Sequence, residues 1–158
     1  MMNQYDQTAL AERKIKSCRK TCELHGLRLT HQRMVILEEI VKAEDHPSAD
    51  VVYRRVREKI PTISLDTVYR TLATFCDLGL ICKVSSTDDS ARYEPMLFPH
   101  HHIICKKCGD IRDIEWSQFD DLNFPEEAVK WGRITGSAAV LRGICRQCLI
   151  DSDQTAPL

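Results

Sequence analysis

Four of the eight cysteines in this sequence occur as two C-x-x-C pairs, a spacing typical of metal binding. Cys105 and Cys108 form the first pair, and Cys145 and Cys148 form the second. Four thiolates suit a tetrahedral ion that holds a fold together, so we predict a structural Zn2+ site. The alternatives are buried free thiols, which would not explain two pairs, and a redox pair, which needs a βαβ frame where this sequence predicts a strand ribbon.

A run of three histidines, His100 to His102, stands just before the first cysteine pair. Alternate side chains of a strand share a face, so His100 and His102 should point together and His101 away. Asp113 falls on what should be the paired strand, where its carboxylate would complete a partial site. Imidazole and carboxylate suit a harder, exchangeable ion such as Fe2+ or Mn2+, and also accept zinc. The alternative is an incidental cluster of solvated histidines.

The chain has 158 residues, of which 43% are hydrophobic, which allows one domain or two small ones. A structural metal would help the smaller of two halves to fold. The sequence begins without a signal-peptide pattern and its cysteines cluster as metal ligands, so we expect a reducing, cytoplasmic setting. No apolar run approaches the length of about 18 residues that a membrane helix needs, so we expect no membrane partner.

Positive charge is concentrated near the start of the chain, although the net charge is only −1. Residues 13–33 carry seven lysines and arginines against one acidic residue, whereas the part after Met96 carries nine acidic residues against seven basic ones. This asymmetry favours a nucleic-acid reader joined to a second part with another role. The alternative is a helix with a solvated basic face.

Apolar spacing and cap residues predict four helices in the first half of the chain. The first spans 10–25, with Cys18 and Cys22 one turn apart on a face that we assign to the core and not to a metal. The expected N-caps of the next three helices are Thr30, Ser48 and Ser64.

Two short strand-like runs, 80–85 and 91–94, follow the fourth helix and are separated by a polar turn. Helices followed by such a hairpin predict a winged helix-turn-helix, whose last helix enters the major groove of DNA. On that helix, Thr67, Tyr69 and Arg70 occupy a face that can contact bases and phosphates. The alternative is an ordinary amphipathic helix with a wet face.

The whole pattern predicts an α+β fold, with a winged helix-turn-helix DNA-binding domain followed by a small α/β dimerisation domain that holds the structural zinc. We place the DNA-binding domain at 1–94, a proline-bracketed hinge at 95–99 and the metal-binding dimerisation domain at 100–158. The last domain should contain two strands, a helix over 116–130 and a long strand over 133–145. A long sheet edge in a small domain needs a cover, so we expect a two-fold homodimer.

These motifs closely resemble those of the ferric uptake regulator (Fur) family, in family order over nearly the whole chain. The matching segments are L-T-x-Q-R at 29–33, H-P-S-A-D at 46–50, S-L-D-T-V-Y-R-T-L at 64–72, R-Y-E at 92–94, H-H-H-I-I-C-x-x-C-G at 100–109 and the final C-x-x-C. The resemblance implies a homodimeric, metal-dependent transcriptional repressor that binds palindromic operators in double-stranded DNA, and not an enzyme.

The resemblance also carries site residues over to this sequence. The regulatory metal would be held by His46, Glu94, His100, His102 and Asp113. The DNA contacts would come from Arg28, which resembles the family's minor-groove reader, and from Ser64, Thr67, Tyr69 and Arg70. Because His46 belongs to the DNA-reading half and the last three metal ligands to the dimer half, a bound ion would fix the angle between the halves.

The aspartate at position 113 resembles the ligand found there in the peroxide-responsive (PerR) branch. In that branch peroxide oxidises a ligand histidine, which would be His46 or His100 here, so that the metal leaves and repression ends. Glu94 stands where that branch tends to have aspartate, so an iron- or zinc-responsive uptake repressor of the same family is the first alternative. Against the iron-sensing branch, Ser137 stands where that branch often has a histidine of a further metal site. A zinc hydrolase with Glu94 as base is a distant one, because no H-E-x-x-H motif occurs.

Overall fold

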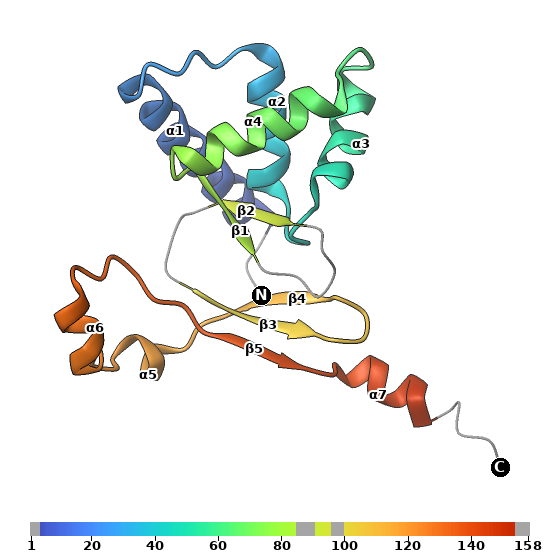
Figure 1. The fold of residues 1–158 in the computed structure, drawn as a ribbon. Coiled ribbons are helices and arrows are strands. Elements are labelled where there is room, and N and C mark those ends of the chain that lie inside the picture. The colour runs from blue at the N-terminus through green and yellow to red at the C-terminus, as the bar shows by residue number, and fades with distance from the viewer. Residues whose placement is uncertain (1–3, 85–90, 96–99, 154–158) are drawn as a thin grey trace. The chain divides into compact units, whose positions relative to one another are not determined.

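The computed structural model describes residues 4–84, 91–95 and 100–153 of the chain. These residues form two compact units, the first from 4–84 with 91–95 and the second from 100–153. We call them the helical unit and the sheet unit (Figure 1). The predicted fold class, a winged helix-turn-helix followed by a small mixed unit, is confirmed by the order of helices and strands.

The helical unit contains, in its described residues, four helices and a two-stranded hairpin. Its elements are α1 (Gln4–Leu24), α2 (His31–Lys42), α3 (Ala49–Lys59), α4 (Leu65–Asp77), β1 (Ile81–Val84) and β2 (Arg92–Pro95). The strands pair antiparallel, with Cys82 opposite Glu94. α2, α3 and α4 pack on one another, as a helix-turn-helix requires. The turn expected between the strands lies outside the described residues.

Local sequence sets where the last three helices of this unit begin. The side-chain oxygens of Thr30, Ser48 and Ser64 each accept a hydrogen bond from the backbone N–H three residues later, which confirms the three predicted N-caps. The predicted start of α1 at residue 10 was wrong, because the helix begins at Gln4. The polar residues 4–9 include no glycine or proline that would stop it.

A continuous apolar core joins the four helices to the hairpin. Its members include Ile36, Leu37, Ile40, Val52, Val56, Val68, Leu72 and Phe75, all fully buried. Cys18 and Cys22 are buried in the same cluster, so their predicted assignment to the core is confirmed. Each large aliphatic or aromatic side chain buried in this way stabilises the unit by roughly 1.5–3 kcal/mol.

The sheet unit is built on three strands in the order β4-β3-β5 within its described residues. Its elements are β3 (His101–Cys105), β4 (Ile111–Ile114), α5 (Ser117–Asp120), α6 (Glu126–Trp131), β5 (Val140–Gly143) and α7 (Arg146–Asp153). β4 runs antiparallel to β3, whereas β5 runs parallel to it. The sequence predicted the first two strands but not α7.

Two predictions for the sheet unit were wrong. The single helix over 116–130 is two short helices, because Pro125 stands at the N-cap of α6 and has no backbone N–H to continue a helix. The long strand over 133–145 is a strand of four residues, because β3 pairs with it only from His102 to Cys105.

The domain boundary expected at 95–99 stays a prediction. Pro95 is the last residue of β2, and residues 96–99 lie outside the described part of the chain. Among the described helices, none is both long and apolar enough to cross a membrane.

Candidate metal centres and nucleic-acid face

The four cysteines of the C-x-x-C pairs meet at one end of the sheet unit. Cys105 ends β3, Cys108 follows in a tight turn, Cys145 precedes α7 and Cys148 lies inside it. Gly109 has a φ of +74°, which lets the turn close so that its N–H donates to the Cys105 carbonyl over 2.9 Å. The second pair lies beside the first because β5 runs parallel to β3 and leads into it.

The spacing of the sulfurs fits a bound metal and not a disulfide. All four Sγ atoms lie within 4.8 Å of one another. The Sγ atoms of Cys108 and Cys145 are 3.8 Å apart, far beyond the roughly 2.05 Å of a disulfide bond. Two sulfurs on one tetrahedral zinc, each at about 2.3 Å, would be about 3.8 Å apart, so this donor set fits that ion.

Hydrogen bonds within the cysteine cluster separate the acidities of its thiols. The backbone N–H groups of Cys108 and Cys145 donate to Cys105 and lower the pKa of its thiol to about 6. A hydrogen bond with the side chain of Cys145 raises the pKa of the Cys148 thiol to about 12. A bound cation would compensate the negative charge of thiolates gathered in this cluster.

In the helical unit, two predicted regulatory ligands are in direct contact. His46 Nε2 lies 3.0 Å from Glu94 Oε2, and both side chains are buried. The loop before α3 is tied to β2 because the Tyr93 N–H donates to the Pro47 carbonyl over 3.0 Å. Imidazole nitrogen and carboxylate oxygen are thereby held side by side as a pair of donors for a cation.

The backbone of His46 is strained. Its φ is +45°, in the left-handed region that a side chain with a Cβ rarely adopts. It also directly precedes Pro47, which restricts its backbone further. Such a conformation costs on the order of 1–3 kcal/mol and persists where the surroundings fix it. The contact with β2 supplies that constraint, so the position of this imidazole is fixed.

Cys82 adds a third group to this pair, which the sequence did not indicate. Its Sγ lies 3.1 Å from Oε1 of Glu94, so the thiol donates to one carboxylate oxygen while His46 contacts the other, Oε2. The antiparallel register places Cys82 directly opposite Glu94, and paired residues share one face of a hairpin. A correct register would have been the only sequence-level signal for this contact.

The sheet unit brings the other three predicted regulatory ligands together. The Nε2 atoms of His100 and His102 are 3.2 Å apart. Asp113 Oδ1 lies 3.8 Å from the first of these nitrogens and 3.6 Å from the second. Asp113 lies on the strand paired to β3, as predicted, and the register places it opposite His102. Two imidazoles and one carboxylate therefore converge at the start of β3.

The middle histidine points to the opposite face, as expected from the alternation. His101 is fully buried, and its Nδ1 accepts a hydrogen bond from the Ala139 N–H over 3.1 Å. Its ring packs edge-on against Phe119 at 4.9 Å between centroids, and its Nε2 lies 3.3 Å from Asp120 Oδ1. His101 thus anchors β3 to α5 and to the segment before β5, between the two histidines predicted to bind a metal.

The residues predicted to contact DNA lie at the start of α4, and neighbours hold them in place. The hydroxyl oxygens of Ser64 and Thr67 are 2.8 Å apart. Tyr69 is 45% exposed, and its hydroxyl donates to Asp50 Oδ2 of α3 over 3.2 Å. Partial desolvation raises the pKa of the Tyr69 phenol, and the nearby Asp50 carboxylate raises it further. This tyrosine therefore offers a neutral, oriented hydroxyl.

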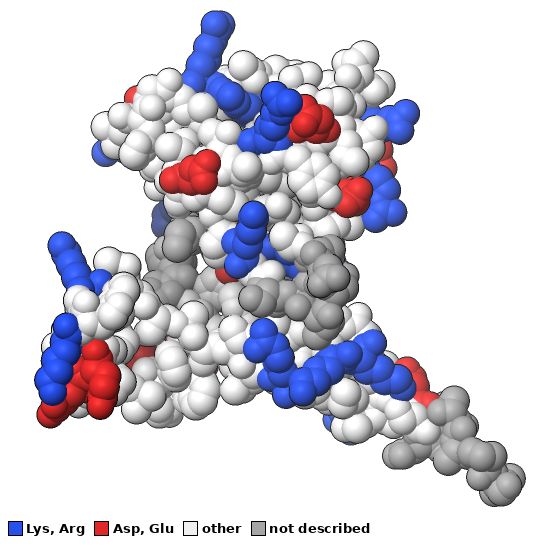
Figure 2. All heavy atoms as spheres, in the orientation of Figure 1, with Lys and Arg blue, Asp and Glu red and all other residues white. Residues whose placement is uncertain are grey.

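Arg70 is also paired with an acidic residue on the same helix. Its Nε lies 2.9 Å from Asp66 Oδ2, and both side chains are well exposed. Figure 2 shows basic side chains projecting from the helical unit with acidic side chains between them, and not an unbroken basic surface. Recognition of DNA by this face would therefore depend on a few positioned side chains as well as on total charge.

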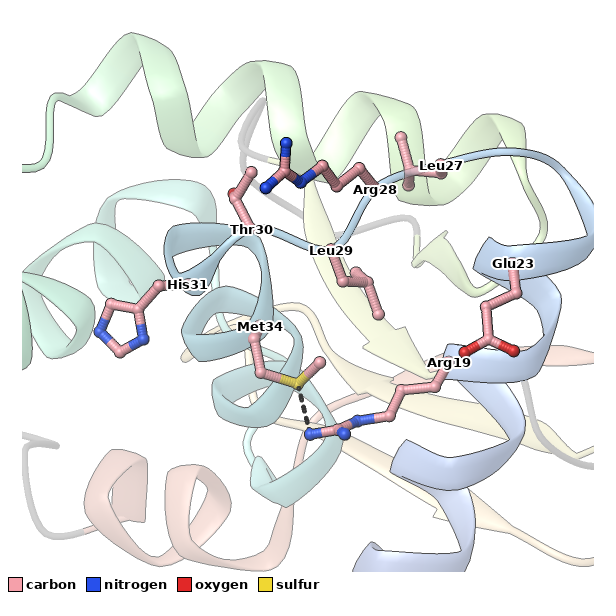
Figure 3. Close-up of a pocket in the computed structure, with 8 residues that line it drawn as sticks. All are labelled: Arg19, Glu23, Leu27, Arg28, Leu29, Thr30, His31 and Met34. Carbon is pink, nitrogen blue, oxygen red and sulfur yellow. Dashed lines mark hydrogen bonds between the residues drawn. The ribbon is translucent and has the colours of Figure 1, made fainter.

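Arg28 lies on the segment that links α1 to α2, beside an open hollow of about 480 Å3 (Figure 3). Its backbone carbonyl accepts a hydrogen bond from Arg33 Nη1 over 2.8 Å, which fixes the segment. The figure shows its guanidinium directed away from the contact between Arg19 and Met34 that closes the other side of the hollow. This placement suits a residue that reaches outward to a partner.

Known proteins share this combination of features. Residues 24–132 match the model of the Ferric uptake regulator family. Over 137 residues the chain is 34% identical to a protein of Staphylococcus epidermidis named peroxide-responsive repressor PerR, and the alignment covers 87% of this chain and 89% of that protein.

Solved structures of metal uptake regulators are also similar to this chain. The Helicobacter pylori ferric uptake regulator superposes with a TM-score of 0.72 over 88% of this chain and 93% of that one, and at 22% identity this likeness supports the fold alone. A zinc-bound manganese uptake regulator superposes with a TM-score of 0.63 at 30% identity, over 81% of this chain and 98% of that one.

Proposed function

Since this chain belongs to the ferric uptake regulator family, we propose that it is a metal-dependent, DNA-binding transcriptional repressor that senses peroxide. The observation that carries the proposal is the grouping of the predicted regulatory ligands into two prearranged sets, one in each unit. Proteins of this family are regulators that bind DNA as dimers, and the proposed site of action is the cytoplasm, where a bacterial chromosome lies.

We assign one exchangeable ion to ligands from both units. The helical unit would contribute the contacting pair of His46 and Glu94, and the sheet unit would contribute His100, His102 and Asp113. Nitrogen and carboxylate donors suit Fe2+ or Mn2+. The four cysteines would separately hold Zn2+, whose thiolate preference and sulfur spacing they match.

An ion that takes ligands from both units would restrict how the units can be oriented. In a two-fold dimer that orientation decides whether the two α4 helices can enter successive major grooves, about 34–36 Å apart. Metal occupancy would thus select the state that binds a palindromic operator, and loss of metal would release it. Arg28 would reach the minor groove, while Ser64, Thr67, Tyr69 and Arg70 would contact the major groove and its phosphates.

Peroxide would act on the ligand histidines. A bound Fe2+ would activate peroxide beside its ligands, with peroxide itself as the two-electron oxidant. His46 or His100 would then gain one oxygen atom on a ring carbon, and the second peroxide oxygen would leave as water. An oxidised ring is a poorer donor, so the strained loop that carries His46 would no longer be held against a cation. Each molecule would respond once, without turnover, and the cysteine site would remain intact.

Operator binding tests the proposal directly. Duplexes selected from a random-sequence library by the Mn2+-loaded protein serve as the probe. We expect similar affinity with Fe2+ and with Mn2+, and at least tenfold weaker binding after peroxide for the Fe2+ form alone. Mass spectrometry should then find the added oxygen on His46 or His100. Oxidation confined to the four zinc cysteines would contradict the proposal.

A matched pair of alanine variants separates ligand loss from general damage. His100→Ala should abolish metal-dependent binding, because it removes a convergent donor. His25→Ala removes an exposed histidine of the helical unit outside both ligand sets and should leave binding unchanged.

An iron- or zinc-responsive uptake repressor is the second candidate, favoured by Glu94 in place of the aspartate typical of the peroxide branch. It shares every proposed DNA contact, so only the response separates the two. If peroxide leaves the operator affinity of both the Fe2+ form and the Mn2+ form unchanged, this candidate is favoured.

A further inference from the structure

We propose that Asp66 is a specificity-determining residue of DNA recognition, which holds the guanidinium of Arg70 so that its terminal nitrogens face the edge of a guanine. This inference rests on the proposed DNA-reading function of α4. It assigns a role in DNA recognition to an acidic side chain, whose negative charge by itself would weaken binding to DNA.

The two residues occupy the end of α4 that enters the groove in a helix-turn-helix. Asp66 is the second residue of the helix, and Arg70 follows four positions later, so both side chains lie on one face. Arg70 Nε is 2.9 Å from Asp66 Oδ2. The side chains are 80% exposed for the arginine and 68% for the aspartate, so a partner can reach both.

The atom used in the ion pair determines what the arginine can still do. A guanidinium is planar and rigid, with one N–H at Nε and four at the two terminal nitrogens. An acid engaged at Nε fixes the plane and leaves Nη1 and Nη2 as a fork. Such a fork matches O6 and N7 of guanine, the two acceptors that mark this base in the major groove. Asp66 thereby reduces the rotamer freedom that Arg70 would otherwise lose on binding.

The same carboxylate weakens contact with the wrong sequence. A negative charge near the duplex repels phosphates whatever the base sequence, so Asp66 lowers non-specific affinity. At the correct site the positioned fork offsets that repulsion, whereas elsewhere nothing does. A repulsive element combined with an attractive one is how many interfaces gain selectivity.

A second acidic residue, which contacts another predicted DNA-binding side chain of α4, serves as a comparison. Asp50 belongs to α3 and accepts a hydrogen bond from the Tyr69 hydroxyl over 3.2 Å. It has no contact with Arg70 among the contacts that the structure describes. Asp50→Asn should therefore change binding without changing preference at a guanine.

The test uses the full-length, Mn2+-loaded protein and the duplexes that it selects from a random-sequence library. Affinity is measured for the consensus duplex, for variants with each G·C pair replaced by A·T, and for a scrambled duplex. Asp66→Asn should lower the ratio of consensus to scrambled affinity by about tenfold, within the range that a bidentate arginine provides. It should also tighten binding to the scrambled duplex by about two- to threefold, because one repulsive charge is gone.

Asp77→Asn is the matched control, because it removes the same charge from an exposed residue at the other end of α4. It should leave the ratio unchanged. A double-mutant cycle adds a readout that a merely structural role would not move. Lysine lacks the fork, so Arg70→Lys should cost much consensus affinity in the parent protein and little in the Asp66→Asn background.

The outcomes distinguish failure of the proposed DNA-reading function from failure of the proposed role of Asp66. If the parent protein selects no consensus, the proposed DNA-reading function fails. If a consensus with guanine is selected and Asp66→Asn leaves its guanine preference intact, only the role of Asp66 is overturned. A consensus without guanine, or additive effects in the cycle, would overturn that role as well.

Discussion

The helical unit and the sheet unit differ in what holds each of them together. The helical unit has a buried core shared by four helices and a hairpin. In the sheet unit, the buried hydrophobic residues among those described are Ile104, Cys105, Ile111 and Cys148, two of which are cysteines of the metal cluster. The first unit can therefore be stabilised mainly by its own packing, whereas the second has far less apolar surface to bury.

Exposed apolar side chains show what the sheet unit requires in addition. All four residues of β5 are exposed, including Val140 and Leu141, and Trp131 of α6 is 81% exposed. The adjacent exposed side chains of Val140 and Leu141 give β5 an apolar surface of the kind that another chain covers. We therefore expect this small unit, with few buried apolar residues, to depend on a structural metal and on a partner chain for its stability.

Removal of zinc is the strongest way to test this contrast. Substituting Cys148→Ser, or extracting the metal with a chelator, should unfold the sheet unit, because structural zinc contributes about 10–16 kcal/mol in small domains. Hydrogen exchange should rise across β3, β4 and β5 and stay low in α2 to α4. Cys76→Ser, a half-buried thiol outside the cluster, should retain zinc. Equal loss of protection in both units would refute the contrast.

A core truncation should have the reverse pattern. Phe75 is fully buried in the helical unit, so Phe75→Ala should lower the free energy of unfolding of that unit by about 3–5 kcal/mol. Urea denaturation followed by hydrogen exchange of each unit measures the effect. Zinc content should not change. Leu24→Ala, at a residue that is 76% exposed, is the control and should cost little.

A charge on β5 should weaken association. Leu141→Asp places a carboxylate on the exposed strand, and burying it against a partner without compensation should cost about 2 kcal/mol or more of dimer stability. Analytical ultracentrifugation would show a larger monomer fraction, with zinc still bound. Leu24→Asp is the matched control on the helical unit. An unchanged dimer in Leu141→Asp would mean that β5 is not the covered surface.

The contrast also explains which features the sequence revealed. Thr30, Ser48 and Ser64 act as caps through local hydrogen bonds, so their positions were readable from neighbouring residues alone. The cysteine pairs were readable because zinc imposes a short spacing. The shared face of His100 and His102 followed from strand alternation, and Asp113 lies on the strand paired to theirs, as predicted.

Features set by tertiary contacts were not readable in the same way. β5 is short because β3 offers few residues to pair with, and this depends on a segment nearly forty residues earlier. The contact of Cys82 with Glu94 depends on the hairpin register, which the sequence did not fix. The spacing of Asp66 and Arg70 places them one helical turn apart, but which guanidinium nitrogen meets the carboxylate depends on side-chain conformation, which the spacing does not determine.

Removing the two buried thiols of α1 should have the smallest effect on the free energy of unfolding. It tests whether water is excluded from the core of the helical unit. Burial raises the pKa of the Cys18 thiol, with a further contribution from nearby Cys22, whose own pKa burial also raises. Both thiols should be neutral in the folded protein at neutral pH, so a Cys18→Ala, Cys22→Ala double variant should show no pH-dependent difference there. Above the ordinary thiol pKa of about 9, the unfolded chain releases these protons first, so the parent protein loses stability relative to the variant as pH rises.

The expected size of that loss is at most about 1.4 kcal/mol per thiol for each pH unit, until the folded-state pKa is passed. Urea denaturation of both proteins from pH 7 to pH 10 isolates it, because lysines and tyrosines titrate equally in the two chains. Ser17→Ala, at an exposed neighbour on α1, should follow the parent protein. Parallel stability curves for the parent and the double variant would mean that water reaches these thiols, and the core around α1 would then be less tightly closed than its burial indicates.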